Sequence, residues 1–146
     1  MPISPANMLL YPGGSIRSPE WLAIRERIRL RAANRCEECG VPNWAIGGRA
    51  PDGRFLPNEP KGTKGLGLDW PSPGQDAWLQ GHLVKIIRIV CTVAHVDGAL
   101  TDHSDANLRF WCQRCHNRHD AQRRAANAAE TRRQLQAIGD LLAGAP

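Results

Sequence analysis

The sequence predicts an α+β domain in which helices flank a pair of antiparallel strands. Three observations indicate this fold class: apolar residues recur at helical spacing after Ser18, β-branched residues are dense over 84–96, and an alanine-rich stretch follows Gln113. A chain of 146 residues has the size of one domain, so we expect a single domain over 1–146. Aromatic residues make up only 5% of the chain, which limits apolar packing and favours a structural metal.

The first helix is expected over 18–35, after an extended arm over 1–17. A capping serine, a proline suited to the first helical position and an acid for the first turn follow one another as Ser18, Pro19 and Glu20. The apolar stripe that this helix would bury consists of Trp21, Ile24 and Ile28. Its arginines alternate by two along the chain and so scatter around the helix. Solvation and DNA contact are both open explanations for them.

Residues 41–81 are predicted to form a long irregular insertion. The segment 40–81 holds nine of the 14 glycines and six of the 11 prolines, which are residues typical of turns. Within it, Asp52-Gly53 is a signal for a hairpin turn. Three tryptophans are expected to anchor the insertion to the rest of the domain: Trp44, Trp70 and Trp78.

Two Cys-x-x-Cys pairs predict a structural zinc site. The ligands would be Cys36, Cys39, Cys112 and Cys115, in knuckles over 36–40 and 112–116. Together they supply the four sulfurs of a tetrahedral zinc site, although 72 residues separate the two pairs. In a reducing compartment such pairs indicate metal binding rather than disulfides. The fifth cysteine, Cys91, lies in an apolar run and is expected to be a buried small hydrophobe.

The positive charge is concentrated in two segments. The chain has a formal net charge of +5, and residues 109–133 hold seven arginines against two acids, while 17–35 hold six against two. A polyanion such as DNA is the natural partner of such a local excess, and a solvated helix face is the alternative. The side chains expected to face phosphate if DNA binds are Arg114, Arg118, Arg123 and Arg124.

The N-terminus lacks a basic region followed by an apolar run, and no stretch has the length of a membrane span. We therefore expect a cytoplasmic protein without a membrane partner. A ββα core is expected over 84–125, followed by a helical tail over 126–146. The late apolar stripe of this tail can dock on the domain or on a second copy of the chain, and it consists of Leu135, Ile138 and Leu142.

The centre of the sequence is a histidine, an asparagine and a second histidine in fixed order. The pattern is H-x11-N-x8-H, from His95 through Asn107 to His116, and its last histidine directly follows the second Cys-x-x-Cys. His95 ends the predicted first strand, and His116 lies where the last helix begins. A phosphodiester hydrolase needs a base that activates water, a group that orients this base and a divalent cation at the phosphate. The compound pattern is specific, whereas each part alone is not.

This pattern resembles the HNH endonucleases, in particular the zinc-stabilised members from phages and bacteria. The matching stretches are TVAH at 92–95, NLR at 107–109, CQRCH at 112–116 and CEECG at 36–40. The resemblance implies a treble-clef-like ββα-metal core that hydrolyses DNA and leaves 3′-hydroxyl and 5′-phosphate ends. It also implies that His95 is the general base, that Asn107 braces the loop between the strands, and that His116 binds the catalytic divalent ion, such as Mg, Mn or Ni.

One position departs from the family pattern. The residue before the catalytic histidine is commonly an Asp or His that binds the metal, and here it is Ala94. Asp97 or His119 can supply the missing ligand. Two other readings remain open: a zinc module that binds nucleic acid without cutting it, and a structural adaptor that uses the zinc fold for protein contact.

Overall fold

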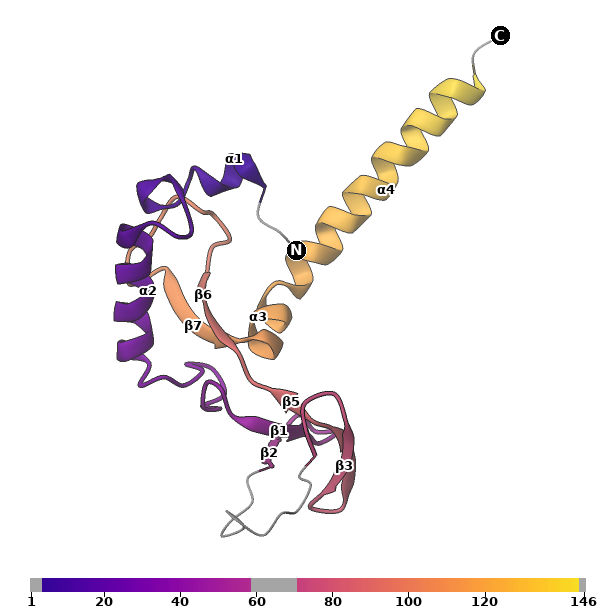
Figure 1. Ribbon diagram of the computed structural model, residues 1–146. Coiled ribbons are helices and arrows are strands. Elements are labelled where there is room, and N and C mark those ends of the chain that lie inside the picture. Colours follow the sequence, from indigo (N-terminus) through magenta and orange to yellow (C-terminus); the bar gives the residue numbers. More distant parts are fainter. Residues whose placement is uncertain (1–3, 59–70, 145–146) are drawn as a thin grey trace. The chain divides into compact units, whose positions relative to one another are not determined.

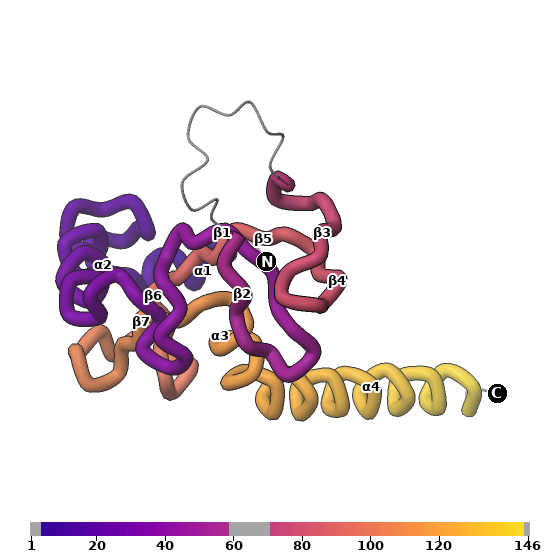
Figure 2. Tube along the Cα trace, turned by 90° about the horizontal axis from the view of Figure 1, so that it is seen from below, coloured from indigo at the N-terminus to yellow at the C-terminus, as the bar shows by residue number. Residues whose placement is uncertain are grey.

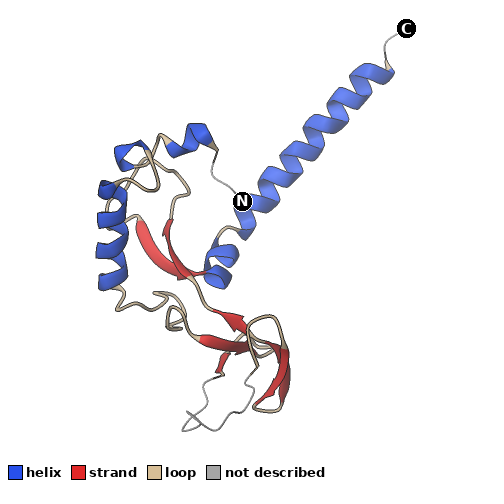
Figure 3. Ribbon diagram, viewed as in Figure 1, coloured by secondary structure: helices blue, strands red, loops and turns tan. Residues whose placement is uncertain are grey.

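The computed structural model describes residues 4–58 and 71–144 (Figure 1). Helices and three small antiparallel sheets make up the described chain (Figure 3), which confirms the predicted α+β class. The chain divides into two compact units, Met1–Gln113 and Arg114–Pro146. Among the helices described, none is both long and apolar enough to cross a membrane.

The first unit holds three helices and seven short strands within its described part. The helices are α1 (Pro5–Met8), the 3-10 helix η1 (Pro12–Gly14) and α2 (Pro19–Arg31). The strands are β1 (Ile46–Arg49), β2 (Phe55–Pro57), β3 (Asp76–Leu79), β4 (His82–Lys85), β5 (Ile87–Arg88), β6 (Cys91–His95) and β7 (Leu108–Cys112). They pair as the sheets β2-β1-β5, β3-β4 and β6-β7. The N-terminal arm, expected to be extended, therefore contains two short helices.

Helix α2 begins as the sequence predicts and ends earlier. The Ser18 hydroxyl accepts a hydrogen bond from the backbone N–H of Trp21 at 3.1 Å, which makes it the N-cap. The helix stops at Arg31 because Ala33 and Asn34 both take positive φ angles, 49° and 56°, which no α-helix can continue. The predicted stripe is present, with Trp21 and Ile28 buried and Ile24 half-buried.

Arginines of α2 fasten the helix to the β6–β7 hairpin beside it (Figure 1). The Arg31 guanidinium donates to the backbone oxygens of Leu108 and Asp105, each at 2.7 Å, and pairs with Glu37 at 2.9 Å. Arg27 pairs with the Asp105 carboxylate at 2.6 Å. These two arginines therefore stabilise the fold through intramolecular contacts. The two explanations that the sequence left open, solvation and DNA contact, did not include this role.

Replacing Arg31 with alanine is expected to lower the free energy of unfolding by about 2 kcal/mol. The substitution leaves two backbone carbonyls and the Glu37 carboxylate without a charged donor. Arg25→Ala, on the same helix, is the matched control and is expected to change stability by less than about 0.5 kcal/mol. Urea denaturation of both variants measures the difference, and equal midpoints would contradict the structural role of Arg31.

The sequence predicted one strand over the apolar run 84–96, and this prediction is wrong. The run is divided among β4, β5 and β6, which belong to three different sheets. The breaks fall where backbone N–H groups leave the ladders: Ile86 donates to Gln75, and Ile89 donates to Ala45, each at 2.8 Å. Apolar periodicity cannot show this, because the run is dense in apolar residues throughout and does not mark where one sheet ends and the next begins.

The insertion contains regular structure of its own. Strands β1 and β2 form a hairpin whose turn includes Gly53 with a φ of 88°, and this confirms the turn predicted at Asp52-Gly53. A small core of Ala50, Leu56, Val84 and Ile86 lies beneath the strands. Gly48 permits the close packing of β1 on β4, because a Cβ atom at this position would collide with the Val84 side chain.

The tryptophans of the insertion do not anchor it as expected. Trp44 is 58% exposed and Trp78 is 71% exposed. Trp70 lies outside the described residues. The small aliphatic core therefore replaces the predicted aromatic anchors in the described part of the insertion.

The second unit is helical throughout its described part. Helix α3 (Gln113–His119) starts at the unit boundary, and α4 (Ala121–Ala143) runs on as one uninterrupted helix (Figure 2). No described residue of α4 is buried. Its exposed large apolar side chains are Leu135, Ile138, Leu141 and Leu142. The predicted stripe is thus exposed on the described helix, and dimerisation through it stays a prediction.

Candidate metal centre and histidine site

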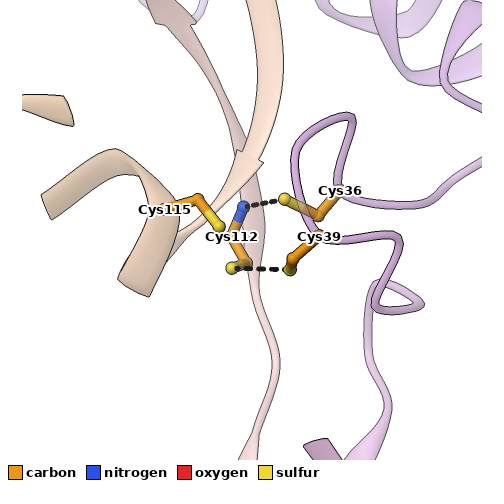
Figure 4. Close-up of side chains that lie close together, drawn as sticks. All are labelled: Cys36, Cys39, Cys112 and Cys115. Atoms are coloured by element: carbon orange, nitrogen blue, oxygen red, sulfur yellow. Dashed lines mark hydrogen bonds between the residues drawn. The ribbon is translucent and has the colours of Figure 1, made fainter. Parts of the chain in front are cut away.

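The first cysteine pair lies in a tight turn between α2 and β1. The Gly40 N–H donates to the Cys36 carbonyl at 2.8 Å, and the Cys36 N–H donates to the Val41 carbonyl at 2.9 Å. Gly40 has a φ of 71°, which glycine adopts without strain. Backbone hydrogen bonds close the turn, and Cys36 and Cys39 lie together on this one loop (Figure 4).

Four sulfur atoms converge at this loop. The Sγ atoms of Cys36, Cys39, Cys112 and Cys115 lie within 4.8 Å of one another (Figure 4). The Cys39 and Cys112 sulfurs are 3.7 Å apart, far longer than a disulfide bond, and no disulfide joins any of the five cysteines, all of which lie among the described residues. Zn–S bonds of about 2.3 Å at tetrahedral angles place sulfurs about 3.8 Å apart. The donor set and its spacing therefore fit a metal ion such as zinc, as the sequence predicted.

The groups around the sulfurs favour ionised thiolates only when a cation is bound between them. Burial raises the pKa of the Cys36 thiol, so a cation is needed to keep this sulfur ionised at neutral pH. The Cys112 N–H donates to the Cys36 sulfur at 3.3 Å. The Arg49 guanidinium lies 3.5 Å from the Cys112 sulfur and offsets the net negative charge of a zinc–tetrathiolate centre. Arg49, from β1, had not been anticipated from the sequence.

Cys91 stands apart from the metal cluster. It is 6% exposed at the start of β6, and burial raises the pKa of its thiol to about 12. A thiol that stays protonated cannot serve as a metal ligand or nucleophile at neutral pH. This confirms the expectation that Cys91 is a small buried hydrophobe.

His95 ends β6 and is held by an aromatic cluster. Its ring lies parallel to the Trp21 indole, with centroids 5.8 Å apart and planes at 7°. Its Nε2 atom is 3.0 Å from Nδ1 of His103, and Nε2 of His103 is 3.0 Å from the Leu10 carbonyl oxygen. Tyr11 packs edge-on against Trp21 at 4.9 Å. The N-terminal arm therefore contributes directly to the surroundings of this histidine.

These contacts determine the tautomer of the neutral histidines. A carbonyl oxygen only accepts, so Nε2 of His103 carries a proton and donates it to Leu10. In neutral His103 the Nδ1 atom is then the acceptor, and Nε2 of His95 must donate to it. The basic lone pair of neutral His95 is consequently on Nδ1. Among the described residues, no group is hydrogen-bonded to this atom.

The charge state of His95 follows from its burial. The side chain is only 7% exposed, and burial lowers its pKa, with a further lowering by His103 and a partial offset by Asp97 and Asp102. His95 is therefore neutral at pH 7, the form in which an imidazole can take a proton. Burial also raises the pKa of Tyr11, which stays neutral beside the histidines.

Asn107 closes the loop between β6 and β7. Its side-chain Nδ2 donates to the Asp97 carboxylate at 3.0 Å and to the Asp102 carbonyl at 2.9 Å, while its Oδ1 accepts from the Asp97 N–H at 3.1 Å. The side chain is 8% exposed, so these bonds form away from bulk water. Both loop residues that the Asn107 side chain binds precede His103 in the chain, and the direct hydrogen-bond partner of His95 is His103.

The candidate ligands of a catalytic ion lie in both units. The Asp97 carboxylate accepts from the Ala99 N–H at 2.8 Å as well as from Asn107. In α3, Nε2 of His116 is 3.3 Å from the Asp120 carboxylate, an arrangement that leaves the lone pair of a neutral ring on Nδ1. His119 is the last residue of α3. The structure brings neither Asp97 nor His116 or His119 into a converging group of three or more metal-binding side chains, as far as the described residues extend.

The four arginines expected to face phosphate are all exposed, in α3 and α4. Two of them make contacts within the second unit: Arg123 pairs with Asp120 at 3.0 Å, and Arg124 donates to the Asn117 carbonyl at 2.6 Å. Arg114 and Arg118 complete the set. The helical segment therefore presents several guanidinium groups to solvent.

Sequence reasoning missed the partners of His95. His103, which the predicted motif does not include, is half-buried and bonded on both ring nitrogens. Its position between two motif residues was a signal, and so was Tyr11, the single tyrosine of the chain, in an otherwise turn-rich arm.

Comparison with protein-family models, with curated proteins and with solved structures found no match for this chain.

Proposed function

We propose that this protein is a metal-dependent endonuclease that hydrolyses DNA phosphodiester bonds on an HNH-type ββα-metal core. One observation carries the proposal: β6, β7 and α3 follow one another, with His95 at the end of the first strand and the cysteine cluster at the end of the second. This is the order that the H-x11-N-x8-H pattern requires. The cluster would hold a structural zinc that joins the hairpin to α3.

His95 would act as the general base. Its neutral ring carries the lone pair on Nδ1, which can accept the proton of an attacking water. The proton on Nε2 stays bonded to His103 throughout, so the ring keeps one orientation. The positive charge that develops on His95 is favoured by the nearby carboxylates of Asp97 and Asp102.

Asn107 would act as a positioning residue. Its three hydrogen bonds fix the loop that carries His103, and His103 in turn fixes the ring of His95. Asn107 thus orients the general base His95 indirectly, through the loop and His103. A base held in one tautomer and one direction loses less entropy when the reaction occurs.

His116 would bind the catalytic divalent ion, with Asp120 orienting its ring. Such an ion, for example Mg, Mn or Ni, would neutralise charge on the phosphate and the leaving 3′-oxygen. Asp97 and His119 are further candidate ligands in place of the residue missing at Ala94. A site with few protein ligands is consistent with an ion that keeps water and substrate oxygens in its shell.

The exposed arginines of the second unit would bind the DNA backbone. The four side chains are Arg114, Arg118, Arg123 and Arg124. Each phosphate contact releases counterions, so DNA affinity should fall steeply as salt rises. Docking of a protein partner would not require such a dependence, and this separates the nuclease from the structural adaptor.

A plasmid assay tests the proposal. The purified protein is expected to nick supercoiled DNA with magnesium, manganese or nickel, and to lose this activity with a chelator that leaves the structural zinc bound. His116→Ala should lower the cleavage rate at limiting metal by about tenfold or more, because a metal ligand is lost. His82→Ala, purified in the same way, is the control for contaminating nucleases. Cleavage by His116→Ala with an unchanged metal titration would contradict the assigned role.

A zinc module that binds nucleic acid without cutting it is the second candidate. The burial of His95, at 7% exposure, and alanine at the position before it favour this alternative. Salt-sensitive retention of DNA without cleavage under any of the three metals would support it and would overturn the nuclease.

A further inference from the structure

A pocket lies in the first unit, away from the histidine cluster. Its volume is about 380 Å³, at the small end of the range for ligand pockets. Its walls come from α2, the segment before β1, strand β6 and the middle of β7. The lining residues used below are Leu22, Arg25, Trp44, Val93 and Phe110. They combine an apolar interior with a cationic side chain at α2.

Trp44 is placed in this pocket by a strained backbone. Its φ angle is 68°, in the left-handed region that bulky residues avoid. The Trp44 N–H donates to the Ile89 carbonyl at 2.8 Å, and the preceding Asn43 side chain accepts from the Cys91 N–H at 2.8 Å. The neighbouring hydrogen bonds therefore hold the conformation in place. The ring nevertheless remains 58% exposed, so burial does not explain why a tryptophan stands here.

The charge of the pocket comes from one side chain. Arg29 forms a bidentate pair with Glu26, at 2.6 and 2.8 Å, so these two groups compensate each other. Arg25, one turn earlier on the same helix, is exposed and has no ion-pair partner within the described chain. The pocket thus offers an aromatic face and an apolar floor beside an uncompensated guanidinium.

We propose that this pocket binds an unstacked base of single-stranded nucleic acid, with the base on the Trp44 ring and a neighbouring phosphate on Arg25. A nucleobase is planar and aromatic, and its backbone carries the negative charge that Arg25 requires. Bases within a duplex are already stacked and cannot enter, so the pocket selects single strands. The inference rests on the proposed function and extends it, because it names the strand conformation that the protein binds.

Fluorescence anisotropy with a labelled single-stranded oligonucleotide tests the inference on the zinc-loaded full chain. Trp44→Ala is expected to weaken binding about 5- to 100-fold, the loss typical of one stacked base. Trp78→Ala is the matched control, since this ring is also exposed, at 71%, but belongs to β3. Arg25→Gln should weaken binding and its salt dependence, whereas Arg88→Gln, an exposed arginine of β5 outside the pocket, should not.

A second variant guards against misfolding. Trp44→Gly removes the ring and relieves the backbone strain, because glycine adopts a φ of 68° readily. Its melting temperature is expected to be no lower than that of the wild type, and its affinity for single strands is expected to be reduced as in Trp44→Ala. Wild-type affinity in both Trp44 variants, or equal losses in Trp44→Ala and Trp78→Ala, would overturn the inference.

The outcome is separable from the nuclease proposal. If the protein cleaves plasmid DNA and its Trp44 variants bind single strands as the wild type does, the base-pocket proposal is overturned and the nuclease proposal stands. Binding that depends on Trp44, without cleavage by any metal, would support the pocket and overturn the nuclease.

Discussion

Cys112→Ser is expected to be largely unfolded at room temperature and therefore to show no cooperative unfolding transition on heating. A structural zinc contributes about 10–16 kcal/mol in small zinc-binding peptides, which equals or exceeds the whole stability of a typical domain. The cluster gathers a turn after α2, the end of β7 and the first turn of α3. With 5% aromatic residues and several sheets of two or three short strands, the remaining core cannot compensate for its loss.

Elemental analysis and circular dichroism measure this effect together. The wild type is expected to contain about one zinc per chain and to melt cooperatively, and a strong chelator should abolish the transition. Cys91→Ser is the matched control, because it places the same hydroxyl at a buried cysteine outside the cluster. It should keep the metal and lose about 1–3 kcal/mol. A metal-free wild type, or a Cys112→Ser variant that melts like Cys91→Ser, would refute the structural metal.

Local signals in the sequence predicted the parts of the fold that depend on neighbours along the chain. The start of α2 was predictable because capping by Ser18 involves residues three apart. The turn at Gly53 was predictable because φ is a property of one residue. The cysteine cluster joins distant segments, but metal chemistry requires its four members, so residue type and count were enough.

Contacts without such a rule were not predictable. The division of 84–96 among three sheets depends on which strand each part meets, and a continuous apolar run does not indicate those partners. His103 bonds to Leu10, 93 residues away, and no spacing rule connects a loop histidine with a backbone carbonyl in the arm. Arg31 likewise reaches Leu108 across the fold. In the candidate site, the motif predicted His95 and Asn107, whereas the partner that directly orients His95 required the structure.

The strained tryptophan illustrates the same limit. The sequence predicted that Trp44 anchors the insertion to the rest of the domain, since large aromatic residues supply much apolar area. The Trp44 N–H donates to the Ile89 carbonyl and the Asn43 side chain accepts from the Cys91 N–H, and the conformation that these bonds hold leaves Trp44 exposed at a pocket. A residue that departs from both burial and φ preference is a candidate for function rather than for packing.

His95→Gln is expected to reduce DNA cleavage by about 100-fold or more while the protein stays folded. General base catalysis by a positioned side chain contributes about 10²–10⁴-fold, and an amide cannot accept the proton of water at neutral pH. The glutamine side chain can still donate to Nδ1 of His103, so the hydrogen-bonded arrangement around the loop can be kept. His95→Ala should lose cleavage as well, but it also removes the ring stacked on Trp21 and should lower the melting temperature.

The comparison of these two variants separates a base from a packing residue. If His95 serves only to fill the space beside Trp21, the alanine variant alone should be affected, through its stability. If it is the base, both variants lose cleavage, and His103→Ala loses part of it because the ring of His95 can then turn. His82→Gln, on β4, is the control for the substitution itself. Undiminished cleavage by His95→Gln would mean that the histidine pair is structural, and the reaction would then need another base.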